Sequence, residues 1–84
     1  SVIAYATLRN REGLIAVRSD ACNKANHAAV LLDEYRKSYK IADKHNVTYS
    51  LKSLKNEIAL HTIIRDMWSA VAIMVNEDLA IINA

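Results

Sequence analysis

The stretch Ala21–Tyr39, ACNKANHAAVLLDEYRKSY, belongs to a heptad pattern that decides the fold. Apolar residues return every seven positions, and a second set lies four residues after the first. This spacing is typical of an amphipathic helix, and lysines and acids take the opposite side. The first set is Leu14, Ala21, Ala28, Tyr35 and Ala42; the second is Ala25, Leu32 and Tyr39, with Val17 near its start.

The alanines of this stripe leave two interpretations open. Small side chains would let a second helix approach closely, which indicates a helix–helix contact. Alanine is also the best helix former, so the same residues could serve only to favour the helix.

A turn follows this helix, which we expect to run from about residue 14 to residue 44, with Gly13 as the break before it. The turn is Lys44–Ser50, KHNVTYS. Asn46 can adopt the left-handed conformation that ends a helix. Thr48 or Ser50 can cap the start of the next one.

A second helix is expected from about residue 49 to residue 75. Its apolar arc widens along the chain until it encloses the whole helix at residues 70–75. One heptad row is Leu54, His61, Trp68 and Val75, continued by Ile82; adjacent rows are Leu60, Met67 and Met74, and Ile64 and Val71.

The chain ends are less regular. Asn76-Glu77-Asp78 is typical of a helix start, so a short helix over Glu77–Asn83 follows at an angle, or the long helix continues. Val2–Leu8 is either a short helix packed on the hairpin or a strand-like arm, and helix fits the composition better. The pattern predicts one all-α domain over residues 1–84. It is a long helical hairpin with short terminal helical segments, assembling into a helical bundle or larger oligomer.

Composition supports this fold and limits its stability. One glycine and no proline in 84 residues permit long helices. A chain this short forms a marginal core and often needs a staple or a partner. The single cysteine, Cys22, excludes an intrachain disulfide, and no Cys/His spacing matches a zinc site. Oligomerisation is the remaining means of stabilisation.

The run Met67–Val75, MWSAVAIMV, has almost no polar side. A bilayer core needs about 20 apolar residues, and charged or polar residues flank this run on both sides. We therefore expect no membrane span, and we see no signal peptide. A helix that is apolar all round must be enclosed all round. This predicts contact with a second copy or another helical protein, unless Val2–Leu8 wraps the exposed face in a compact monomer. The predicted interface residues are Met67, Trp68, Val71, Met74 and Val75.

Positive charge gathers around the turn. Between Tyr35 and Asn56 the chain has six basic residues and a single acid, Asp43, with tyrosines among them. Such a tip can contact phosphates, although a solvated lysine-rich loop gives the same pattern. The candidate contacts to an anionic partner are Arg36, Lys37, Lys40, Lys44, Lys52 and Lys55.

Catalytic and metal chemistry find little support. Glu57 and His61 share a helix face, with Leu32 and Glu34 expected roughly opposite. The second Glu/His pair of a carboxylate-bridged metal site is missing, so we expect no metal and no cofactor. No histidine is placed where it could activate Cys22 as a nucleophile, so Cys22 is expected to be a partly buried packing residue. The sequence thus predicts a non-enzymatic protein that acts through self-assembly and protein contacts, with a nucleic-acid-binding regulator as the alternative.

Overall fold

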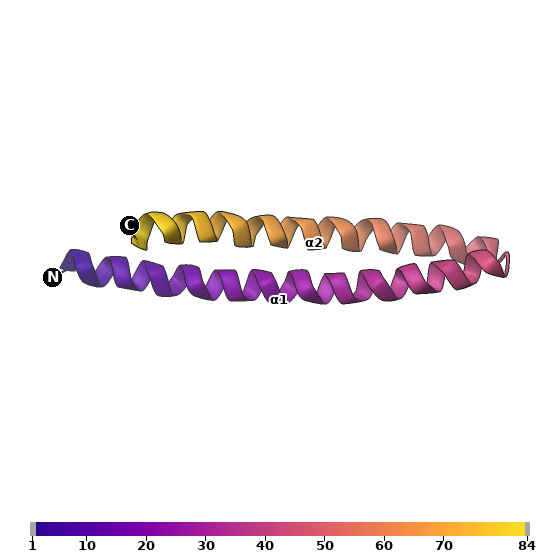
Figure 1. The fold of residues 1–84 in the computed structure, drawn as a ribbon, viewed down its shortest axis with the longest axis horizontal. Helices are drawn as coiled ribbons and strands as arrows, with labels where there is room; N and C mark the ends of the chain where they lie inside the picture. The colour runs from indigo at the N-terminus through magenta and orange to yellow at the C-terminus, as the bar shows by residue number, and fades with distance from the viewer. Residues whose placement is uncertain (1, 84) are drawn as a thin grey trace.

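Two long antiparallel helices make up the fold. The computed structural model describes residues 2–83, with side chains from residue 10 onward. Helix α1 spans Val2–Lys44 and helix α2 spans Thr48–Asn83. They pack side by side as a hairpin, with both termini at one end of the molecule (Figure 1). The predicted all-α helical hairpin is confirmed.

The turn between the helices depends on one left-handed residue. Asn46 has φ 56°, as its position predicted. Its amide donates to the Asp43 carbonyl at 3.2 Å, and the Val47 amide donates to the Ala42 carbonyl at 3.0 Å. These two bonds form a Schellman motif, which satisfies the last carbonyls of α1.

The start of α2 differs from the prediction. The Leu51 amide donates to the Val47 carbonyl at 3.3 Å, so Val47 takes the capping position. Neither Thr48 nor Ser50 therefore caps the helix. Val47 is the last residue of the Schellman motif and also the residue before α2, so the capping position falls on a residue without a capping side chain.

The contact between the helices, here called the hairpin seam, contains most of the predicted α1 stripe and the predicted row of α2 from Leu54 to Ile82. The second row of α2 in this contact, Ile58, Arg65, Ala72 and Leu79, was not predicted. Every seam residue is buried or half-buried. Ala21 is 0% and Ala28 2% exposed, so the alanines lie at the helix contact and do more than favour helix. Val17, expected near the start of the second set, is exposed, and Arg18 takes the seam position. The seam is formed by Leu14, Arg18, Ala21, Ala25, Ala28, Leu32, Tyr35, Tyr39 and Ala42 of α1, and by Leu54, Ile58, His61, Arg65, Trp68, Ala72, Val75, Leu79 and Ile82 of α2.

The terminal segments are helical, but they extend the two long helices and do not form separate pieces. Gly13, predicted to be a break, lies inside α1. One exposed glycine costs a helix only about 1 kcal/mol relative to alanine, too little to end it here. At the other end, α2 continues through Asn76 to Asn83. Because Val2–Leu8 continues α1, it does not fold back over residues 70–75; its side-chain contacts lie outside the described residues.

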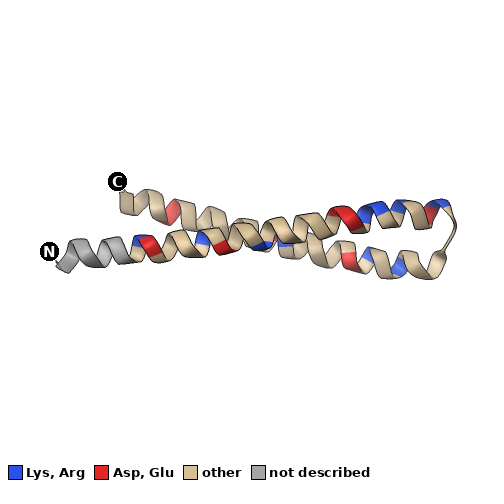
Figure 2. Ribbon diagram, turned by 90° about the horizontal axis from the view of Figure 1, so that it is seen from below, with Lys and Arg blue, Asp and Glu red and all other residues tan. Residues whose placement is uncertain are grey.

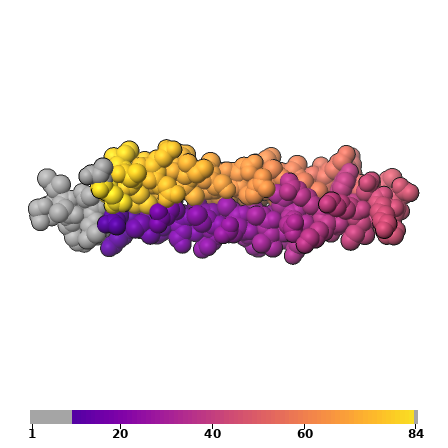
Figure 3. Space-filling model, in the orientation of Figure 1, coloured from indigo at the N-terminus to yellow at the C-terminus, as the bar shows by residue number. Residues whose placement is uncertain are grey.

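The result is a thin rod. Its Cα atoms extend over 67 × 14 × 14 Å. In the face shown in Figure 3, both helices are open to solvent along the described length. Each helix therefore has a partner on one side only, and the outer faces decide what the molecule can bind.

Candidate interaction surface

Helix α2 carries a second apolar row on its outer side. The row repeats the 4–3 spacing of the hairpin seam but starts at a different position. At 100° per residue, the centres of the two rows lie roughly 110° apart around the helix. We call it the outer seam, and it consists of Leu60, Ile64, Met67, Val71, Met74, Asp78 and Ile81.

Most of the outer seam is exposed. Four of its large apolar side chains are between 50% and 75% exposed, and Ile64 and Val71 are half-buried. Ile63, beside the row, is also more than half exposed, as is Ile73 on another face of α2. Apart from Asp78, the row is apolar, and exposed apolar patches are the kind of surface through which proteins contact other proteins or membranes. The four exposed seam residues are Leu60, Met67, Met74 and Ile81.

The structure divides the predicted interface residues between the two rows. Met67 and Met74 lie on the outer seam and are exposed, with Val71 half-buried beside them. Val75 is 6% exposed and Trp68 half-buried, both on the hairpin seam facing α1.

Four exposed apolar residues of α2 were missed as interface candidates. The row of Leu60, Met67 and Met74 was visible in the sequence, and extending it by seven residues reaches Ile81. Ile63 and Ile73 carry no comparable signal, because they belong to neither seam.

Trp68 is covered by its own chain. The Lys24 Nζ atom lies 4.4 Å from the Trp68 ring centroid and 2.9 Å from Oδ2 of Asp20. Beside this contact runs an open groove of about 420 Å³ between α1 and α2. Its apolar walls include Leu31 and Ile64, so the groove adjoins the outer seam.

The outer face of α1 is different in character. Lysines, arginines and acids dominate it, and ion pairs such as Lys37 Nζ to Asp33 Oδ2 at 3.0 Å lie along it. Among the described side chains of α1, from residue 10 onward, the exposed large apolar residues are scattered and form no row. They are Ile15, Val17, Val30 and Ile41.

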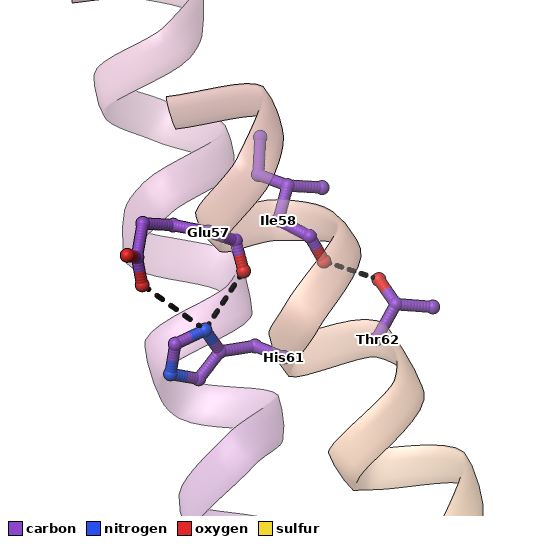
Figure 4. A network of polar contacts seen from close by, with 4 residues as sticks. All are labelled: Glu57, Ile58, His61 and Thr62. Carbon is purple, nitrogen blue, oxygen red and sulfur yellow. Dashed lines mark hydrogen bonds and ion pairs between the residues drawn. The ribbon is translucent and has the colours of Figure 1, made fainter. Parts of the chain in front are cut away.

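His61, which was considered as a metal ligand and not predicted to be one, is held within its own helix (Figure 4). His61 Nδ1 donates to the Glu57 carbonyl at 2.7 Å and lies 3.6 Å from Glu57 Oε2. The imidazole ring also contacts Tyr35 of α1, with 5.0 Å between centroids. Across the described part of the chain, no group of three or more His, Cys, Asp and Glu residues could hold a metal ion. The geometry is that of a packed seam histidine.

The prediction that Cys22 is partly buried is wrong. The residue is exposed. It follows Ala21 by one residue, and a rotation of about 100° turns it out of the seam.

The basic tip is formed by the turn-proximal ends of both helices (Figure 2). All six predicted basic residues are exposed: Arg36, Lys37, Lys40, Lys44, Lys52 and Lys55. Tyr49 is 83% exposed, whereas Tyr35 and Tyr39 lie half-buried in the hairpin seam. One tyrosine of the three is thus free to stack on a ligand at the tip.

By length and composition alone, α2 is apolar enough to cross a membrane. Only 17% of its most apolar 18-residue stretch is buried. The expectation of no span counted the nine residues Met67–Val75, whereas an 18-residue stretch of α2 is apolar enough to pass this test. A lipid surface is therefore a competitor for the same exposed face.

In comparisons with known proteins, no family model, curated protein or solved structure matches the chain.

Proposed function

We propose that this chain is a non-enzymatic assembly subunit or adaptor that binds another helix through the outer seam of α2. The observation that carries the proposal is the exposed apolar row from Leu60 to Ile81, opposite a charged outer face on α1. A helix that contacts two partners at once needs two apolar rows, and α2 has both.

The energetics fit a reversible contact. Burying the exposed part of one such side chain stabilises the complex by about 1–2 kcal/mol. Four side chains on each of two chains give roughly 8–16 kcal/mol, against a cost of association of about 4–15 kcal/mol. A dissociation constant of about 1 μM needs a net of roughly 8 kcal/mol, which lies within the range that these two terms allow.

Sedimentation at micromolar concentration tests the proposal. The variant M67E/M74E places two charges on the outer seam, and we expect it to be monomeric while its circular dichroism stays helical. The matched control is V30E/I41E, since Val30 and Ile41 of α1 are 59% and 63% exposed, close to Met74 at 62%. The control should assemble like the wild type.

Two outcomes would reject the proposal. One is a wild-type chain that is folded and monomeric at micromolar concentration. The other is a chain that is monomeric in buffer and sediments with lipid vesicles, because the outer seam would then be a lipid-binding face.

The basic tip supports a second candidate, a nucleic-acid-binding regulator. Its six exposed cations come from both helices, and Tyr49 beside them offers a ring for base stacking. Changing Lys40, Lys44, Lys52 and Lys55 to glutamine should leave the fold intact, since exposed charges contribute little to stability.

Retention on DNA or RNA, measured against salt concentration, distinguishes this candidate. Each phosphate contact contributes about 0.7–0.9 to the slope of log affinity against log salt. A binding wild type and a four-lysine variant with a clearly shallower slope would support the candidate. Retention that does not change with salt concentration would exclude nucleic-acid binding through the basic tip.

A further inference from the structure

We propose that Asn46 is the acceptor for an N-linked oligosaccharide. The proposal concerns the turn of the hairpin and does not depend on what the outer seam binds.

The first observation is the sequence of the turn. Asn46-Val47-Thr48 has the form Asn-X-Ser/Thr with a residue other than proline in the middle, which is the acceptor sequence for N-linked glycans. The chain has seven asparagines, and Asn46 is the one with a hydroxyl residue two positions later. The sequence therefore offers a single candidate position.

The second observation is where the structure places this sequence. The other asparagines all lie in α1 or α2, whereas Asn46 lies in the turn between the helices. Asn46 and Thr48 are both exposed, and the turn forms the end of the rod opposite the termini (Figure 1). The acceptor amide and the hydroxyl that a transferase must contact are thus accessible on a surface loop, the setting in which N-linked glycans occur.

The third observation is that backbone hydrogen bonds hold the turn. The Asn46 amide donates to the Asp43 carbonyl, and the Val47 amide donates to the Ala42 carbonyl. A sugar on the side-chain nitrogen of Asn46 breaks neither bond. The modified residue keeps the side-chain carbon skeleton of asparagine, which tolerates the observed φ of 56°. The hairpin can therefore carry the glycan without a change of fold.

The modification forms one bond and breaks one. Asn46 Nδ2 bonds to the anomeric carbon of a sugar, and the bond from that carbon to the pyrophosphate of a lipid-linked oligosaccharide breaks. The lipid pyrophosphate leaves with the electron pair, and the amide nitrogen gives up one proton. The co-reactant is thus an oligosaccharide on a lipid pyrophosphate, which the turn meets in the secretory pathway.

The position of the glycan separates the two candidate functions. Thr48, where α2 begins, lies roughly 18 Å along the helix from Leu60, the first residue of the outer seam. Lys44 and Lys52 of the basic tip lie close to Asn46 in the chain. A glycan at Asn46 is therefore compatible with assembly through the outer seam, but it covers the surface that nucleic-acid binding needs.

The intact mass of the chain, isolated from the cells that naturally make it, tests the proposal. We expect a mass above that of the polypeptide, by a sum of sugar residues. Peptide N-glycosidase should remove the excess and leave aspartate at position 46. A chain with the bare polypeptide mass would overturn the proposal, and so would sugar that the enzyme does not release.

Variants expressed in the same cells locate the attachment. Asn46→Gln and Thr48→Ala should lose the sugar, whereas Thr48→Ser should keep it. Thr48→Ala leaves Asn46 in place, and Thr48 does not cap α2, so circular dichroism should stay helical. The matched control is Asn56→Gln, since Asn56 is exposed but has Ile58 two positions later. A Thr48→Ala chain that still carries the sugar would overturn the assignment to Asn46.

Discussion

Lys24 of α1 holds its ammonium group 4.4 Å from the ring centroid of Trp68 of α2. The same Nζ atom pairs with Asp20 one turn earlier, at 2.9 Å. The cation therefore links the two helices at the one tryptophan of the chain. Because that indole is a natural fluorophore, the packing of the hairpin can be followed without a label.

Replacing Lys24 by alanine should increase the access of acrylamide to Trp68 and lower the free energy of unfolding. A cation–π contact at an exposed site contributes about 0.5–1 kcal/mol. Lys37→Ala is the matched control, since it removes the same kind of i, i+4 ion pair with Asp33 but contacts no aromatic ring in the described structure. Equal quenching in the two variants would contradict the contact.

Asn46→Val should destabilise the hairpin by about 1–2 kcal/mol, because a β-branched residue tolerates φ near +56° poorly. Asn46→Gly should be neutral or slightly stabilising. Urea denaturation measures both. Asn56→Val is the control, as Asn56 is exposed inside α2 and the two residue types have similar helix propensity. If Asn46→Val changed the free energy of unfolding no more than Asn56→Val does, residue 46 would not have the left-handed conformation of a Schellman motif.

Ala28→Leu should destabilise the fold by about 1–3 kcal/mol through overpacking. Ala28 is 2% exposed at the helix contact, so added methyl groups must push the helices apart. Ala16→Leu, at an exposed position of α1, should change the unfolding midpoint little. If the Ala28→Leu variant unfolded at the wild-type midpoint with unchanged Trp68 fluorescence, the helices would be further apart than in the structure.

Gly13→Ala should stabilise the chain by about 0.5–1 kcal/mol. Nothing lies within 4 Å of an added Cβ, and the residue is inside a continuous helix. Thermal unfolding followed by circular dichroism measures the gain. No gain, or a loss, would indicate that the helix breaks at residue 13, as the sequence first suggested.

Cys22 should react with a small alkylating reagent at nearly the same rate in native and urea-unfolded protein. Its side chain is exposed, so folding gives it little protection. Mass spectrometry of the modified chain gives both rates. Protection of more than roughly tenfold would place the thiol in a contact that the hairpin alone does not supply.

The heptad rows of the two helices were predictable because helix contacts depend on a period that the sequence displays directly. His61, Trp68 and Val75 share a predicted row, and all three lie in the hairpin seam. The turn was predictable for a similar reason, since Asn46 is the residue there most suited to a left-handed conformation.

Other features depend on contacts that no local pattern reveals. Asn76 looks like a helix start, yet its Oδ1 accepts a hydrogen bond from Arg18 Nη1 at 2.9 Å, and α2 runs through it. Gly13 looks like a break, yet the helical residues on both sides outweigh its cost. The division of Met67 and Trp68 between two faces needed the packing of α1, which decides which of two adjacent apolar rows it covers.

The alanine-rich seam also changes how this chain should respond to sequence variation. Seven apolar residues of the described structure are buried, and four of them are alanines: Ala21, Ala25, Ala28 and Ala72. In a globular domain, the harmful substitutions are mostly those that shrink a large core side chain and leave a void. At these four positions there is nothing to shrink, whereas Leu32, Val75 and Leu79 are large and buried. A saturation mutational scan should therefore divide the seam into two classes, with enlargement damaging at the alanines and truncation damaging at the large residues.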